Sequence, residues 1–165
     1  MAFFRRDKDE ESPPPAPVDP GPPADERPEV LGAETWKLIR LVNASAGRLP
    51  GSAVVEARGI TDTLRAIIAT SAVRPLDVYT LVAVKGIVYD YLPTTLQTFL
   101  SLDPSLVDVP RPNGRTPLQS LDDQLASLQD AADRVLEAAR AQDVDALMTQ
   151  GNFLSTKFDR SDLDL

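Results

Sequence analysis

Apolar side chains recur every three or four residues over much of the chain, which is the spacing of amphipathic α-helices. This pattern predicts a first helix over residues 30–45 and a second over residues 52–72. Gly47 and Pro50 separate the two, because they are residues that end a helix or cannot continue one. Within the second helix, Gly59 is expected to kink the helix or to admit a close neighbour.

The most apolar stretch spans residues 76–102. Its apolar positions do not alternate with period two, and the run is too long for an ordinary strand of about 5–6 residues. We therefore interpret it as helical, despite its many β-branched residues. Asp77 is the expected N-cap, and Pro93 interrupts the far end. The stretch is either one kinked long helix or two helices that meet at Leu92–Pro93.

The polar residues of this stretch are scattered round the helix and form no face, which is typical of a helix buried on several sides. We expect it to be the core helix of a bundle, and we expect Gly86 to let another helix approach closely. Lys85 lies among apolar neighbours, so we expect it to reach the surface or to pair with a carboxylate.

The clearest helical pattern covers residues 116–142. Thr116 and Gln119 have the spacing of a capping box, with Pro117 at the first helical position. Leucine, valine and alanine then repeat at alternating spacings of three and four and form a heptad seam: Leu118, Leu121, Leu125, Leu128, Ala132, Val135 and Ala139. The seam can pack inside the bundle or join two copies, and for one helix of a small bundle we favour packing inside.

Asp143 is the expected cap of a last helix over residues 144–158, which would form a hairpin with the helix before it. The chain is thus predicted to be all-α, with a bundle of five or six helices over residues 30–158. A flexible acidic end is expected over residues 159–165.

Residues 1–29 hold eight of the fifteen prolines and many acidic residues, so this segment is predicted to be a disordered tail. Its tip is aromatic and basic, and we consider Phe3, Phe4, Arg5 and Arg6 candidate partner-binding residues. The alternative is a solvating spacer with no binding role.

Prolines and an Asn-Gly pair predict a loop over residues 103–115. Arg111 and Arg115 give this loop positive charge and are further candidate partner-binding residues. Phosphate binding by this loop is an open alternative, although the loop does not follow a strand and lacks the glycine-rich turn that cradles a phosphate.

Composition narrows the possible functions. The 165 residues carry a net charge of −8, which argues against a general nucleic-acid binder, because such a protein needs a basic surface. The chain has no cysteine and no histidine, which excludes disulfides, cysteine-ligated metals and the nucleophile systems that depend on histidine. We assign no catalytic residue, no cofactor and no metal ligand.

The start of the sequence points to a cytoplasmic protein. The apolar run that an export signal needs does not follow Arg5 and Arg6. Arginine outnumbers lysine, and this usage suggests a bacterium with a GC-rich genome.

The twelve residues YDYLPTTLQTFL, at positions 89–100, are similar to a known family segment. They resemble the YYLPTTLKLL-type segment of the 5-bromo-4-chloroindolyl phosphate hydrolysis protein family, whose members are small bacterial, mostly helical proteins. The resemblance implies a helical fold and hydrolysis of a phosphate ester. It supplies no catalytic residue that can be carried over to this chain.

Together these features favour a non-catalytic interaction or scaffold protein that binds a protein partner or itself. Two alternatives stay open. One is a phosphoester hydrolase or stress-linked protein, as the family resemblance implies. The other is a peripheral membrane protein that uses the aromatic and basic tip.

Overall fold

The computed structural model describes residues 23–161, with side chains over residues 23–142. These residues contain helices and no strand, so the all-α prediction is confirmed. The helices are α1 (Pro28–Ser45), α2 (Gly51–Thr70), α3 (Val78–Lys85), α4 (Leu92–Leu100) and α5 (Pro117–Ser161). A π-helical segment, η2 (Gly86–Tyr91), joins α3 and α4 into one rod. The described part of the chain therefore has four helical rods, and the predicted count of five or six was wrong.

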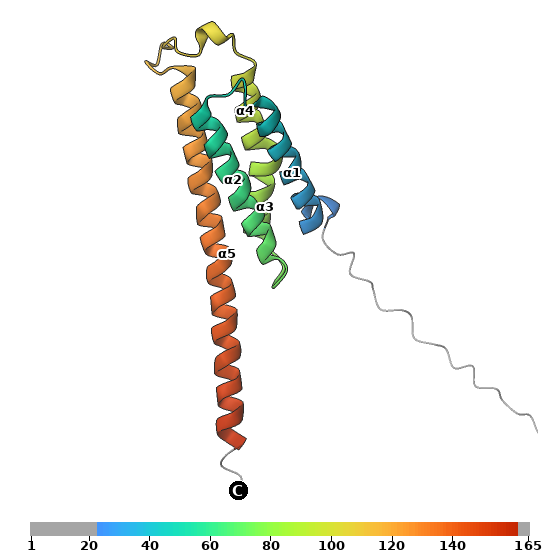
Figure 1. Cartoon of the computed structure of the whole chain (residues 1–165). Helices are drawn as coiled ribbons and strands as arrows, with labels where there is room; N and C mark the ends of the chain where they lie inside the picture. The colour runs from blue at the N-terminus through green and yellow to red at the C-terminus, as the bar shows by residue number, and fades with distance from the viewer. Residues whose placement is uncertain (1–22, 162–165) are drawn as a thin grey trace, which may run out of the picture.

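The four rods run alternately up and down, and α5 extends well beyond the end of the other three (Figure 1). Two short 3-10 turns lie outside the rods, η1 (Ala24–Glu26) before α1 and η3 (Pro104–Leu106) in the loop before α5. The first rod begins at Pro28, two residues before the predicted start, because proline is well suited to the first turn of a helix.

The core lies between the facing apolar sides of the rods. From α2 it takes Ala57, Ile60, Leu64 and Ile67, all fully buried. The heptad seam of α5 packs into the same core, with Leu121, Leu125, Ala132 and Ala139 buried. The seam is thus used inside the chain, as favoured from the sequence.

Gly59 on α2 lies close to a side chain of α5. A β-carbon added at Gly59 would lie 2.9 Å from Oε1 of Gln129 on α5. Gly59 therefore admits a close neighbour, which is one of its two predicted roles.

The rod formed by α3, η2 and α4 buries every fourth residue over five positions: Thr80, Val84, Val88, Leu92 and Leu96. On an α-helix of 3.6 residues per turn, each residue in such a series is rotated about the helix axis by about 40° from the one before it. On an unbroken α-helix, the last of these residues would therefore point away from the core. In η2 the Leu92 N–H donates to the Ile87 carbonyl, five residues back, which underwinds the chain and offsets part of the drift.

Gly86 has a different role from the one expected. A β-carbon there would lie 2.9 Å from Cε2 of Tyr91, so its close neighbour is a ring from the same π segment and not another helix. The glycine leaves room for the tyrosine where the backbone is underwound.

The first turn of α5 has the predicted capping box. The Gln119 N–H donates to Oγ1 of Thr116, and the Thr116 N–H donates to Oε1 of Gln119, each at 3.1 Å. From there α5 continues without a break for 45 residues, a length of about 68 Å at 1.5 Å per residue.

The predicted helix over residues 144–158, with its cap at Asp143, was wrong as a separate element. Asp143 lies inside α5, and no hairpin forms there. The residues around it contain no proline or glycine, and alanine, glutamine and leucine all favour continuation of a helix.

Asp77 is the N-cap of α3, as predicted, and it links the turn before α3 to α5. Its carboxylate accepts from the Tyr79 and Thr80 N–H groups at 2.9 and 3.1 Å and from the Thr80 hydroxyl at 2.7 Å. It also accepts from Nε2 of Gln142 on α5 at 3.2 Å. The Thr80 hydroxyl, more than any other contact, holds the pKa of Asp77 below its ordinary value.

We predict that Asp77→Ala lowers the free energy of unfolding by about 1 kcal/mol, as for other N-caps, and that Asp77→Asn lowers it less. Because the pKa of Asp77 is depressed in the folded chain, this charge-dependent stability is present above its ordinary pKa and is lost as the pH falls through the depressed value. Urea unfolding of the three chains at neutral and strongly acidic pH measures both effects. Equal stability of the wild-type and Asp77→Ala chains at neutral pH would contradict the assignment of Asp77 as a stabilising N-cap of α3.

Candidate functional site

The most exposed apolar surface on any described helix lies on α3. Val78, Tyr79 and Val82 are 63%, 84% and 65% exposed, and we call these three residues the α3 apolar face. Val73, in the turn before α3, is also exposed. Single exposed apolar residues are ordinary, whereas a group that contains an aromatic ring and lies on one helix is a candidate binding surface.

The α3 apolar face arises because the helix is apolar all round while the core covers only part of it. Thr80 and Val84 are the residues of α3 that are buried. The expectation that this helix is buried on several sides was therefore wrong for its first two turns. Sequence reasoning missed the face because exposed and buried valines look alike in a helix that shows no polar side.

The segment before α1 is attached to α3 close to this face. Nζ of Lys85 lies 2.6 Å from Oδ2 of Asp25 and 3.2 Å from Oε1 of Glu26, so the predicted pairing of Lys85 with a carboxylate is confirmed. The hydrogen bond with Lys85 lowers the pKa of Asp25, and the same bond is the largest cause of the raised pKa of Lys85. The η1 turn is thus held against α3 by two ion pairs.

Lys85 shares one side of the helix with Val78 and Val82 of the α3 apolar face. Lys85 follows Val82 by three residues and Val78 by seven, and both spacings place side chains on the same side of an α-helix. The distance along the axis from Val78 to Lys85 is about 10 Å at 1.5 Å per residue. Asp25 and Glu26 are therefore held at the side of α3 that carries Val78 and Val82.

A polar groove lies between η2, α4 and α5. It encloses about 590 Å³ and is lined by Asp90, Tyr91, Thr94, Thr95, Thr98, Asp123, Gln124, Ser127 and Leu128. Five of these nine residues come from the segment that carries the family resemblance. The groove offers hydroxyl and amide groups with two carboxylates. The phosphate-ester hydrolysis that the family resemblance implies stays a prediction and is assigned to no residues of the chain.

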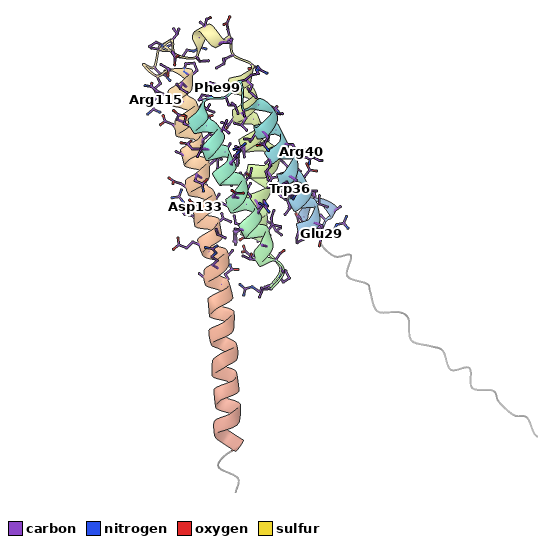
Figure 2. All side chains as sticks on the ribbon, viewed as in Figure 1. Glu29, Trp36, Arg40, Phe99, Arg115 and Asp133 are labelled. Atoms are coloured by element: carbon purple, nitrogen blue, oxygen red, sulfur yellow. The ribbon has the colours of Figure 1, made fainter. Side chains whose placement is uncertain are left out.

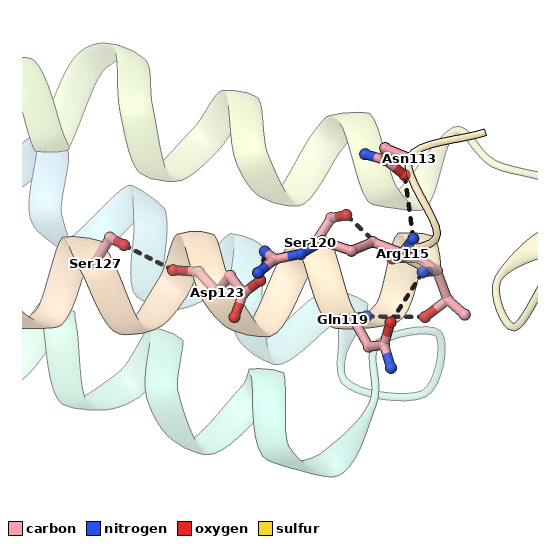
Figure 3. A network of polar contacts seen from close by, with 7 residues as sticks. Asn113, Arg115, Gln119, Ser120, Asp123 and Ser127 are labelled. Carbon is pink, nitrogen blue, oxygen red and sulfur yellow. Dashed lines mark hydrogen bonds and ion pairs between the residues drawn. The ribbon is translucent and has the colours of Figure 1, made fainter. Parts of the chain in front are cut away.

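The candidate residues of the loop before α5 have local structural roles. The Arg115 guanidinium pairs with the Asp123 carboxylate on α5, and the Arg115 N–H donates to Oδ1 of Asn113 at 3.1 Å (Figure 3). Gly114 has a φ of 79°, which allows the turn closed by its N–H and the Arg111 carbonyl at 2.8 Å. Arg111 lines a second groove of about 220 Å³ beside Phe99 and Leu121.

Of the sequence-predicted site residues, the structure describes Arg111 and Arg115, and the Arg111 N–H donates to the Arg115 carbonyl at 2.8 Å. Phe3, Phe4, Arg5 and Arg6 lie outside the described residues. Arg115 lies at the end of the bundle far from Glu29, near which the chain enters α1 (Figure 2). A partner role for the two arginines of the loop stays a prediction.

A buried carboxylate oxygen on α2 was not foreseen from the sequence. Oε2 of Glu56 on α2 is buried and has no hydrogen-bond partner among the described residues. Burial raises the pKa of Glu56, and the charge of Asp122 on α5 raises it further. This carboxylate therefore opposes the packing of α2 against α5 when it is ionised.

Over the described side chains, no three acidic residues lie close enough together to form a metal site. Among the described helices, none is both long and apolar enough to cross a membrane. Comparisons with models of known families, with curated proteins and with solved structures found no match to this chain.

We predict that Glu56→Gln raises the melting temperature by a few degrees at neutral pH. A carboxyl whose pKa is raised by folding destabilises the folded chain increasingly as the pH rises from its ordinary pKa through the raised value. The gain should therefore vanish at a pH below the ordinary pKa of 4.5. Thermal unfolding over a pH series measures this, with Asp62→Asn on the exposed side of α2 as the control. A gain that persists unchanged in acid would refute the explanation.

We also predict that Lys85→Met releases the η1 turn from α3. Amide hydrogen exchange over residues 24–31 should become several-fold faster, because the two ion pairs that hold this segment are removed. Lys37→Met, which removes an ion pair within α1, is the matched control and should leave this exchange unchanged. Equal exchange in the Lys85→Met and wild-type chains would show that the turn is held by other contacts.

Proposed function

We propose that the protein is a non-catalytic interaction protein of a bacterial cytoplasm that binds a short apolar segment of a protein partner on the α3 apolar face. The observation that carries this proposal is the exposure of Val78, Tyr79 and Val82 on a helix whose opposite side is anchored in the core. A rigid helix in a bundle presents such side chains in a fixed arrangement, which lowers the entropy lost on binding.

The size of the face suits a short segment better than a folded domain. A stable interface between two folded proteins involves about 20–30 residues on each side and buries about 800 Å² per partner. The α3 apolar face with Val73 has four residues, one of them a tyrosine, which is a residue type enriched among those that dominate binding energy.

The energy available fits a reversible complex. Burial of one valine or aromatic side chain contributes about 1.5–3 kcal/mol, so the face offers several kcal/mol before the losses of association are subtracted. This supports binding in the micromolar to millimolar range and not a permanent assembly.

We predict that Tyr79→Ser combined with Val82→Ser lowers partner binding at least tenfold in a pull-down from the native host with the whole chain. Val55→Ser on α2 is the matched control, since Val55 is 70% exposed and lies on another helix. All three chains should have the same melting temperature, because none of these side chains is in the core. Undiminished binding by the double variant would exclude the α3 apolar face as the binding surface.

A further inference from the structure

We infer that the chain's own aromatic tip, Phe3 and Phe4, docks on the α3 apolar face and competes with the partner for it. This inference rests on the proposed function, since it concerns regulation of the same face. On this inference, the tip binds within its own chain and covers Val78, Tyr79 and Val82, so that a partner can reach them less often.

The first argument is the place from which the tip is tethered. The ion pairs of Lys85 with Asp25 and Glu26 fix the last turn of the N-terminal segment against α3. Lys85 is on the same side of α3 as Val78 and Val82, one turn or two away from each. The tether therefore starts at the edge of the face that the tip would cover.

The second argument is length. The eighteen residues at positions 5–22 separate Phe4 from Pro23. A proline-rich chain extends by about 3.1 Å per residue, so this tether reaches up to about 55 Å, while the face lies within about 10–15 Å of Lys85. The tip can reach the face even when most of the tether is folded back.

The third argument is chemical. Among the residues before Pro23, Phe3 and Phe4 are the aromatic ones, and aromatic rings supply the largest apolar area per residue. Arg5 and Arg6 give the tip positive charge, and acidic residues outnumber basic ones over residues 23–165, which favours its approach to the bundle. A short aromatic segment is the class of ligand to which the size of the face is suited.

The tether makes a weak contact effective. If the tether gives an effective concentration of about 1 mM, the value for a short flexible linker, a tip with an intrinsic Kd of about 0.1 mM would occupy the face about nine-tenths of the time. The partner's apparent affinity would then be lowered about tenfold. A second copy of the chain lacks this advantage, and the four exposed residues are too few for a stable dimer interface.

The test uses the absence of cysteine from the chain, which lets a single introduced thiol report its own accessibility. Val82→Cys is introduced into the whole chain and into the whole chain with Phe3→Ser and Phe4→Ser, and the rate of alkylation by a maleimide is measured in each. Val55→Cys, at an equally exposed position on α2, is the matched control in both backgrounds.

The inference predicts that Val82→Cys reacts about tenfold more slowly with the native tip than with the serine tip, at all protein concentrations, while Val55→Cys reacts equally in both. Equal rates at Val82→Cys would overturn it. Protection that grows with protein concentration would also overturn it, because the occupant would then be a second copy.

The serine-tip chain also separates this inference from the proposed function. In the pull-down from the native host it should bind the partner about tenfold more tightly than the wild-type chain. If alkylation rates are equal but Tyr79→Ser with Val82→Ser still loses the partner, the inference fails and the proposed function stands. If the tip protects the thiol but the double variant keeps its partner, the tip has a docking site and the proposed function fails.

Discussion

The whole arrangement depends on how one proline is accommodated in the third rod. Pro93 has no N–H to donate, and its ring crowds the carbonyl four residues back, so it breaks the hydrogen bonding of an ordinary α-helix. Here the turn before it is a π segment, Gly86–Tyr91, and the rod continues through it. Because the π segment underwinds the backbone, Val84 and Leu96 both face the core although their spacing of twelve residues would separate them on a regular α-helix.

That continuity leaves the α3 apolar face exposed. The core needs one line of buried residues along the rod, and the π segment keeps this line intact on both sides of Pro93. Val78, Tyr79 and Val82 lie outside that line and stay exposed within the described part of the chain. The same helix is paired with Asp25 through Lys85. Asp25 is therefore held at the side of α3 on which Val78 and Val82 are exposed.

Sequence reasoning succeeded where a local rule decides the structure. The N-cap at Asp77 and the capping box of Thr116 and Gln119 are recognisable because the side chain and the backbone group that it bonds are two or three residues apart. It failed at Asp143, where an aspartate that could cap a helix lies inside one, because the residues on both sides favour helix continuation and outweigh a single cap.

The candidate site was harder to predict from the sequence than the fold. No periodicity distinguishes Val82 from Val84 in a helix that is apolar all round, yet one is exposed and the other is buried. The π segment adds to the difficulty, since it shifts the register midway along the rod. The attachment of Lys85 to Asp25 joins residues that are sixty positions apart, and such a pairing has no local signal.

The most direct test of the central claim is site-specific photo-crosslinking in the native host, with a benzoylphenylalanine in place of Tyr79. If the α3 apolar face is a binding surface, this position should give discrete adducts, either within the chain to residues near Phe3 or to one partner protein. The same probe in place of Val55, which is similarly exposed on α2, should give no such adducts. Equal, diffuse labelling at both positions would contradict the account, because the face would then be an exposed surface that nothing recognises.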